Sequence, residues 1–437
     1  MTLTRIVLEA LIKIAVLLAG LMMAAAYLVL VERRVAAWIQ DRRGPNRVGI
    51  PLTRIRLFGL GQPIADGVKF IFKEEFTPAH VDKALYRLAP ILMLAAAVAV
   101  YAVIPFGSVL PESIGRSGEP IRLVVAPGID VGMLYIFALS GMAIYGVLLG
   151  SWASNNKYSF LGGMRSAAQL ISYEVPLGLG VLGVVLVSGS LRLETIIAEQ
   201  ARSGVWNVLV QPLGFLVFAV AAWSEAQRLP FDLAECEQEL VGGFHTEYSG
   251  IKLMLYLVAE YLHMITASFL MVILFFGGWH FWGLTGWEEA VGWPVALLRI
   301  AVLLTKVLAV ILFFMLARWS WPRFRFDQLM SLAWKALLPL GLIHVVAVAF
   351  AIAYGDRMAG AMGLPARWVE AGLGWVVLGA AGLAVGWLDP ARSDNRPLPV
   401  PWLVAPQCFS GRENAAAWEQ DLRAVAEPSS IPGDPSP

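Results

Sequence analysis

Long uninterrupted apolar runs are the feature that most constrains how this chain folds. Runs of roughly 18–22 apolar residues recur along it, and a helix of that length crosses the hydrocarbon core of a bilayer. A soluble domain carries about 25% charged residues. Here only 15% of the 437 residues are charged and 58% are hydrophobic. The sequence therefore predicts an all-α polytopic membrane protein.

About nine transmembrane helices are expected from these runs. They are placed at residues 9–31, 86–105, 131–152, 167–188, 206–224, 253–277, 297–317, 336–354 and 368–388. Residues 1–390 would form the transmembrane domain, with an arginine-rich cytoplasmic loop at 32–85 and an acidic cytoplasmic loop at 225–252. The Pro-rich tail, 391–437, is expected to be disordered.

The distribution of positive charge predicts how the helices are oriented. Cytoplasmic loops are enriched in lysine and arginine. The loops on one side of the predicted membrane hold most of the 33 lysines and arginines. This places the N-terminus outside and the C-terminus in the cytoplasm, in a multi-pass protein of the cell's inner (plasma) membrane.

Composition also limits the cofactors and partners. A net charge of +1 provides no basic field for nucleic acid. The two cysteines, Cys236 and Cys408, cannot supply the four thiolates of an iron–sulfur cluster. The five histidines include no i,i+4 pair, so no haem or metal site is expected. We expect this chain to carry no redox cofactor of its own.

The first cytoplasmic loop begins with a cluster of arginines. They are Arg33, Arg34, Arg42, Arg43 and Arg47. An anchor that follows the positive-inside rule would explain them. However, the segment 44–46, Gly-Pro-Asn, imposes a turn between the arginines, and this arrangement favours a docking surface for a soluble cytoplasmic partner.

The segment 61–74 is predicted to be an amphipathic helix that lies in the membrane interface. One face carries Ile64, Val68, Ile71 and Phe72, and the other carries Asp66, Lys69 and Lys73. Pro63 suits the first turn of a helix. Beside the first span, such a helix would frame a lateral opening toward lipid, with Asp66 near a lipid-soluble substrate.

Acidic residues crowd a short segment of this otherwise apolar chain. Its carboxylates are Glu225, Asp232, Glu235, Glu237, Glu239 and Glu247, and its one arginine is Arg228. Glu174 and Glu260 lie inside predicted spans. Charges near hydrocarbon cost several kcal/mol unless they are paired, hydrated or neutralised. Structural pairing is one explanation, but so many acids favour proton handling.

The spacing of Glu235 and Glu239 predicts that they share one helical face. Like charges at i,i+4 repel each other. Buried acids of this kind titrate as a coupled set, so some of them should hold protons near neutral pH. Tyr173, Tyr248 and Tyr261 each adjoin an acid and would relay or orient a proton.

Several segments occur in one order between about Glu32 and Pro339. They are ERRVAAWIQDRRGPNRVG, GQPIADGVKFIFKE, GSWASNNKYSFLGGMRSAAQLISYEVP, SEAQRLPFDLAECEQELVGGFHTEYSG and PRFRFDQLMSLAWKALLPL. Together they resemble the H subunit of the proton-pumping NADH–quinone oxidoreductase, the membrane subunit of respiratory complex I that lies next to the peripheral arm. The segments PFDLAECEQELVGG and GQPIADGVK are long and specific.

The resemblance implies a chain that forms the floor and entrance of a quinone chamber. Electrons would reach quinone from an iron–sulfur cluster in a neighbouring subunit, and quinone would enter between the first and sixth spans and the interfacial helix. The positions that match the quinone chamber are Glu32, Arg33, Arg42, Asp66 and Arg228. The positions that match an acidic proton path are Glu174, Glu225, Glu235, Glu237, Glu239, Glu247 and Glu260.

The same resemblance implies the partners. They are the peripheral-arm iron–sulfur and quinone-site subunits, the small membrane subunits, the antiporter-like subunits, membrane lipid and quinone. The chain would be a subunit of an H⁺-translocating NADH:quinone oxidoreductase. It departs from the pattern in a lengthened first loop around IPLTRIRLFG, and in the ninth span and the tail.

Three alternatives stay open at this stage. One is the quinone-independent anchor subunit of a related membrane-bound hydrogenase, although GPNRVG and ADGVK are complete here. Another is an ion-coupled transporter, which the missing internal repeat and the arginine-rich loop disfavour. The third is a structural anchor whose acids only pair with neighbouring subunits.

Overall fold

The computed structural model describes residues 3–49, 58–110, 121–286, 292–363 and 365–388. The chain divides into two units, residues 1–383 and 384–437. Of the second unit only 384–388 are described, and the predicted disordered tail lies outside the described residues. Most of the lengthened part of the first loop, residues 50–57 of 50–59, also lies outside them.

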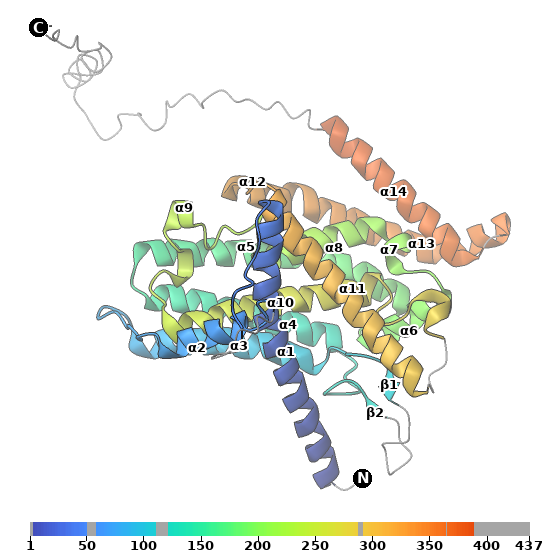
Figure 1. Ribbon diagram of the computed structural model, residues 1–437. Coiled ribbons are helices and arrows are strands. Elements are labelled where there is room, and N and C mark those ends of the chain that lie inside the picture. Colours follow the sequence, from blue (N-terminus) through green and yellow to red (C-terminus); the bar gives the residue numbers. More distant parts are fainter. Residues whose placement is uncertain (1–2, 50–57, 111–120, 287–291, 364, 389–437) are drawn as a thin grey trace, which may run out of the picture. The chain divides into compact units, whose positions relative to one another are not determined.

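Within the described residues, seven helices are long and apolar enough to cross a membrane. They are α1 (Leu3–Ile39), α3 (Lys83–Ala99), α4 (Gly132–Ala153), α5 (Lys157–Ser188), α10 (Gly250–Phe275), α11 (Trp293–Ser320) and α13 (Leu338–Met362). Helices α8 (Pro212–Glu225) and α14 (Ala366–Leu388) correspond to the two remaining predicted spans. The prediction of an all-α polytopic membrane protein is confirmed (Figure 1).

Shorter elements connect the long helices. The short α-helices are α2 (Gln62–Phe72), α6 (Leu193–Ser203), α7 (Asn207–Val210), α9 (Glu237–Leu240) and α12 (Phe326–Ser331). The 3₁₀ turns are Val100–Ala102, Gly243–His245 and Trp282–Leu284, and a π-helical turn, Leu332–Leu337, joins α12 to α13. The strands β1 (Val109–Leu110) and β2 (Ile121–Arg122) pair antiparallel, with Val109 opposite Arg122.

Helix α10 lies at the centre of the first unit. Its most apolar window is 83% buried, compared with 22% for that of α1. It contacts α1, α3, α8 and α11, and α1 crosses it in Figure 1. Because lipid tails are as apolar as leucine, the outer helices can leave apolar side chains exposed. Because α10 is buried among these helices, its side chains are surrounded mainly by protein.

Small residues let α4 approach its neighbours closely. A Cβ atom at Gly146 would lie 2.7 Å from the Cβ of Met93 on α3, and one at Gly150 would overlap the Tyr256 hydroxyl on α10. This is the small-xxx-small spacing that allows membrane helices to pack backbone to backbone. It brings α4 against Tyr256 of α10, one turn before Glu260.

Lys306, an intramembrane cation on α11, holds the turn that follows α10. Its Nζ donates to the carbonyl oxygens of Phe276, Gly278 and His280 at 2.7, 3.0 and 2.6 Å. These carbonyls belong to the turn that follows α10, and buried carbonyl oxygens need donors, so the ammonium satisfies them. Lys306 therefore has a structural explanation that is separate from the acidic residues.

The predicted amphipathic helix is observed as α2, with Pro63 in its first turn. Its apolar face is open: Ile64 is 67%, Ile71 is 60% and Phe72 is 84% exposed. Asp66, on the other face, accepts a hydrogen bond from Arg33 Nη1 at 2.8 Å. This ion pair ties α2 to α1, while the apolar face of α2 stays available to lipid.

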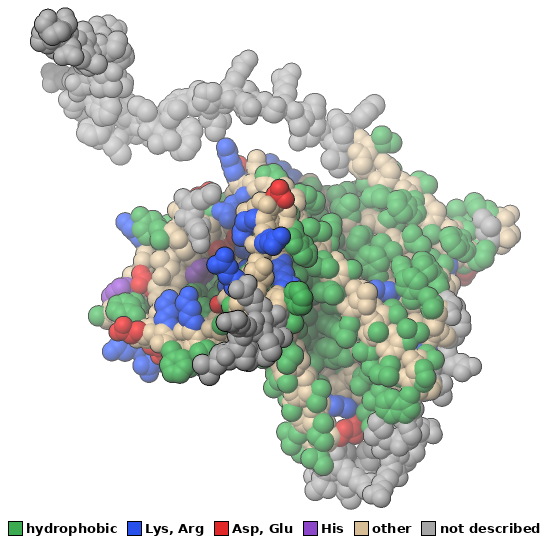
Figure 2. Space-filling view, in the orientation of Figure 1, with side chains coloured by type: hydrophobic (Ala, Val, Ile, Leu, Met, Phe, Trp, Pro, Cys, Tyr) green, Lys and Arg blue, Asp and Glu red, His purple; other side chains and the backbone are tan. Residues whose placement is uncertain are grey.

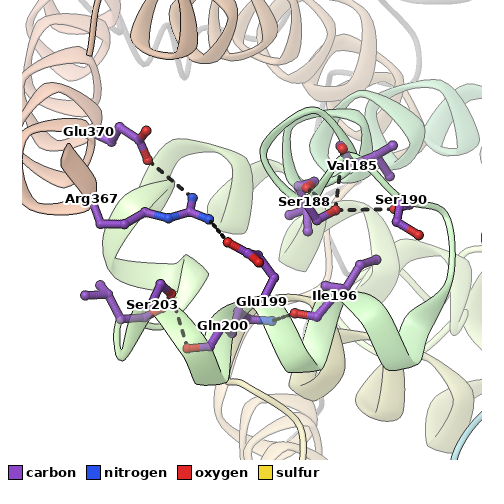
Figure 3. A network of polar contacts seen from close by, with 11 residues as sticks. Val185, Ser188, Ser190, Ile196, Glu199, Gln200, Ser203, Arg367 and Glu370 are labelled. Carbon is purple, nitrogen blue, oxygen red and sulfur yellow. Dashed lines mark hydrogen bonds and ion pairs between the residues drawn. The ribbon is translucent and has the colours of Figure 1, made fainter. Parts of the chain in front are cut away.

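A polar network fastens the start of α14 to α6 (Figure 3). Arg367 Nη2 lies 2.9 Å from Glu199 Oε1 on α6, and Arg367 Nη1 lies 3.3 Å from Glu370 Oε2 one turn along α14. A Cβ atom at Gly374 would overlap the carbonyl oxygen of Val210. The start of α14 is thus packed against α6 and α7 through specific contacts.

Candidate functional site

A buried arginine lies at the centre of the acidic segment. Arg228 is 7% exposed, in the loop that follows α8. Its Nη1 is 3.9 Å from Glu32 Oε2 on α1, and its Nη2 is 3.7 Å from Glu260 Oε2 on α10. Burial alone would lower the pKa of Arg228. Its interactions with Glu32, and then with Tyr261 and Glu260, outweigh burial and raise this pKa. One buried cation therefore joins carboxylates from two helices.

Glu32 has further partners. Arg318 Nη1, from the end of α11, donates to Glu32 Oε1. The Tyr261 hydroxyl donates to Glu32 Oε2, and the Arg228 guanidinium lies over the Tyr261 ring at 4.4 Å from its centroid. A buried carboxylate is stable when paired and hydrogen-bonded in this way. Glu32 thus joins α1, α10, α11 and the acidic loop.

The buried acids Asp232 and Glu235 differ in their surroundings. Burial raises the pKa of Asp232 to about 6, and nearby Glu235 adds to this, although Arg323 opposes it from 3.4 Å. Burial also acts to raise the pKa of Glu235. However, a hydrogen bond with Glu260, and then His245 and Arg228, bring the pKa of Glu235 below its ordinary value.

The carboxyl groups of Glu235 and Glu260 lie within hydrogen-bonding reach of each other. An ionised carboxylate only accepts hydrogen bonds, so this contact requires a proton on one of the two groups. Two acids that share a proton titrate as a pair. Beside Arg228, the pair can gain or release a proton in response to a change of charge.

Two adjoining cavities lead from this pair along the face of α10. One, of about 340 Å³ including space open to the surface, is lined by Glu260, Gln227, Glu225 and Ser140 among others. The second, of about 400 Å³, is also lined by Glu225 and Ser140. Glu225, at the end of α8, also interacts electrostatically with Glu174 on α5. Glu174 lies where α4 and α5 meet: a Cβ atom added to Gly141 of α4 would be 3.4 Å from Glu174 Oε1.

The structure thus brings half of the predicted site residues into one series. Glu32 and Arg228 come first, then Glu235 with Glu260, then Glu225, and finally Glu174. Arg33 and Asp66 form a separate pair at the junction of α1 and α2. Arg42 is exposed, and its Nε donates to Gln40 Oε1 at 2.8 Å.

The other predicted acids have different partners. Glu239 is paired with Arg165 at 2.5 Å, and Glu239 is about half exposed. Glu247 Oε1 accepts a hydrogen bond from Asn156 Nδ2 at 2.6 Å, and its backbone carbonyl accepts one from the Tyr86 hydroxyl. The side chain of Glu237 lies outside the described part of the structure.

The expectation that Glu235 and Glu239 share a helical face is wrong. The helix α9 begins only at Glu237 and has a single turn, so Glu235 precedes it in irregular backbone. Glu235 faces inward to Glu260 and lies 3.8 Å from His245 Nδ1, whereas Glu239 faces Arg165. A loop that contains Pro230 positions these acids independently of each other.

Sequence reasoning missed several contacts of this site. Arg318 and Arg323 were counted only as cytoplasmic charge, although they pair with Glu32 and Asp232. His263, one turn beyond Glu260 on α10, lines both cavities. The i,i+3 spacing of Glu260 and His263 was the signal that could have indicated a shared helical face.

Comparison with known proteins now adds the family. The NADH dehydrogenase family profile matches residues 12–349. An H subunit of the NADH-quinone oxidoreductase of Rhizobium meliloti (strain 1021) is 45% identical over 334 residues, which cover 76% of this chain and 94% of that one. This chain belongs to the family of NADH-quinone oxidoreductase H subunits.

Other H subunits agree with this assignment. One from Geobacter metallireducens (strain ATCC 53774 / DSM 7210 / GS-15) is 46% identical over 76% of this chain and 93% of its own. The Flavobacterium psychrophilum protein is 43% identical over a region that covers 78% of this chain and 96% of its own. The family profile ends before α14 begins, so α14 lies beyond the shared region. The recognition made from the sequence is confirmed.

Proposed function

We propose that this chain is the membrane subunit of a proton-translocating NADH–quinone oxidoreductase, where it forms the quinone chamber and couples quinone reduction to proton movement. Family membership supports the assignment to the complex. The observation that carries the coupling role is the buried Arg228 between Glu32 and Glu260, from which cavities lead to Glu225.

The quinone chamber lies, in this proposal, where Glu32, Arg33, Arg42, Asp66 and Arg228 face the peripheral arm. The pair Arg33–Asp66 joins α1 to α2, and the open apolar face of α2 suits a lateral opening for a lipid-soluble quinone. Glu32 and Arg228 form the floor. No residue of the chain transfers electrons, because these come from a neighbouring iron–sulfur subunit.

The arginine-rich surface suits the docking of the peripheral arm. Figure 2 shows lysine and arginine side chains gathered over the C-terminal end of α1 and over α2, whereas the side formed by α11 is mostly apolar. Arg33, Arg42, Arg43 and Arg47 are exposed there. By the positive-inside rule this end faces the cytoplasm of an inner (plasma) membrane, with the N-terminus outside.

The coupling is electrostatic. Reduction of quinone takes two electrons and two protons, so negative charge develops in a low-dielectric chamber. At an effective dielectric constant of about 20, a unit charge 4 Å from a carboxylate changes its energy by about 4 kcal/mol, or about three pKa units. That shift is enough for the Glu235–Glu260 pair to take up a proton. This change in protonation is then passed on through Glu225 and Glu174 toward the antiporter-like subunits.

Replacing Glu235 with glutamine tests this function. The variant keeps the shape of the side chain but cannot share a proton with Glu260, so NADH–quinone turnover and proton pumping should each fall about tenfold. Glu237→Gln, at the neighbouring predicted position, is expected to impair both as well. Both rates are measured in inverted membrane vesicles that contain the assembled complex.

The matched control is Glu194→Gln. Glu194 is a carboxylate on α6 that pairs with Arg122 and Arg192, outside the acidic path. Its turnover and pumping should match those of the unaltered complex. Full turnover and full pumping in the Glu235→Gln and Glu237→Gln variants would remove the basis of the proposal.

A further inference from the structure

His263 occupies a distinctive place among the histidines of this chain. It lies three residues after Glu260 on α10, the most deeply packed of the long helices. Its Nε2 is buried and has no hydrogen-bond partner within the described part of the chain. The residue belongs to none of the family-implied positions of the chamber or the acidic path.

The two cavities of the site meet at His263. Both are lined by His263, Glu225, Ser140 and Ala226. Only the first reaches Glu260, and only the second extends past Thr266 toward Leu270. An imidazole thus lines the same cavity as the carboxyl that shares a proton with Glu235 and the next acid of the series.

We propose that His263 carries the proton from Glu260 to Glu225, an inference that rests on the function proposed above. A neutral imidazole has one nitrogen that accepts a proton and one that donates, so it can take a proton at one side and release it at the other. Glu225 and Glu260 are the titratable groups that line the two cavities with it among the described residues.

The transfer takes two balanced steps. First, the proton of the Glu260 carboxyl moves to the imidazole, which leaves a carboxylate beside Arg228 and an imidazolium. Then the imidazolium gives a proton to the Glu225 carboxylate, and the neutral imidazole returns. A water molecule can bridge either step, because the carboxyl, hydroxyl and imidazole groups that line the cavities give it hydrogen-bond partners.

The test replaces His263 with glutamine, which keeps hydrogen-bonding atoms but does not bind a proton at neutral pH. In the assembled complex, NADH–quinone turnover should fall about fivefold, since water in the cavities substitutes only partly for a general acid–base group. The ratio of the rates in H₂O and D₂O should rise, because proton transfer becomes slower. Electron transfer from NADH to a water-soluble acceptor that bypasses quinone should not change.

His344→Gln is the matched control. His344 is a buried histidine on α13 whose Nε2, like that of His263, is buried and has no partner among the described residues, but it lines neither of the two cavities. Its turnover and isotope ratio should match those of the unaltered complex. An equal loss with an equal isotope ratio in both histidine variants would show a packing effect and overturn the proposal.

A comparison with Glu225→Gln separates this inference from the proposed function. Normal turnover of His263→Gln beside impaired Glu225→Gln would reject the role of His263 and leave the acidic path intact. Normal turnover of both would reject the proposed function as well. If His263→Gln fails to assemble, His263→Asn is measured in the same way, and its normal turnover would equally reject the role of His263.

Discussion

Replacing Arg228 with leucine should prevent stable assembly of this protein into its complex. Arg228 is the buried cation shared by Glu32 and Glu260, and it opposes the charge of Glu235. Removing one partner of a buried ion pair leaves the other charge uncompensated and costs about 3–5 kcal/mol. The yield of chain that co-purifies with iron–sulfur subunits, and the thermal midpoint of the purified complex, should both fall sharply.

Two further variants sharpen the Arg228 experiment. Arg228→Lys keeps the charge but loses the planar fork that reaches two carboxylates and lies over Tyr261, so its midpoint should be intermediate. Arg202→Leu removes an exposed arginine at the end of α6 and should assemble normally. If Arg228→Leu assembled with an unchanged midpoint, the pairing described here would not stabilise the fold.

Replacing Glu225 with glutamine should cause the largest loss of activity. Among the described acids, Glu225 alone lines both cavities, so a proton that leaves the Glu235–Glu260 pair must pass it. Loss of a positioned proton-transfer group typically costs 10²-fold or more, so NADH–quinone turnover coupled to pumping should fall about 100-fold. Glutamine has nearly the same shape, so assembly should be unaffected.

The aspartate variant is the matched comparison for Glu225. Glu225→Asp keeps a titratable carboxyl on a shorter side chain and should retain a measurable part of the turnover, whereas the glutamine variant should not. Both variants are compared at equal amounts of assembled complex, as judged by electron transfer to an acceptor that bypasses quinone. Equal turnover in the two variants would mean that the acid at this position moves no proton.

Much of the fold could be predicted because membrane helices follow from local composition. The length of each apolar run sets the span, and the spacing of Ile64, Val68 and Ile71 predicts the surface helix α2. The span predicted at 206–224 is less simple, because Pro212 separates α7 from α8. The hairpin of β1 and β2 carries too short a pattern to be predicted.

The interior of the site could not be predicted because its contacts join distant parts of the chain. Arg318 and Glu32 are 286 positions apart, and no local pattern indicates that they pair. Glu235 and Glu239 illustrate the same limit: helical spacing suggested one face, but a loop containing Pro230 turns them toward different partners. The family pattern indicated which acids to expect at the site, and tertiary packing decided how they are arranged.

In the proposed mechanism, reducing quinone changes the protonation of the buried acids. Difference infrared spectroscopy of the intact complex, reduced minus oxidised, measures this through the carbonyl stretch of protonated carboxyl groups. We expect a carboxyl band that shifts in D₂O, weakens in Glu235→Gln and Glu225→Gln, and persists in Glu194→Gln. A spectrum in which no carboxyl band changes on quinone reduction would contradict the account.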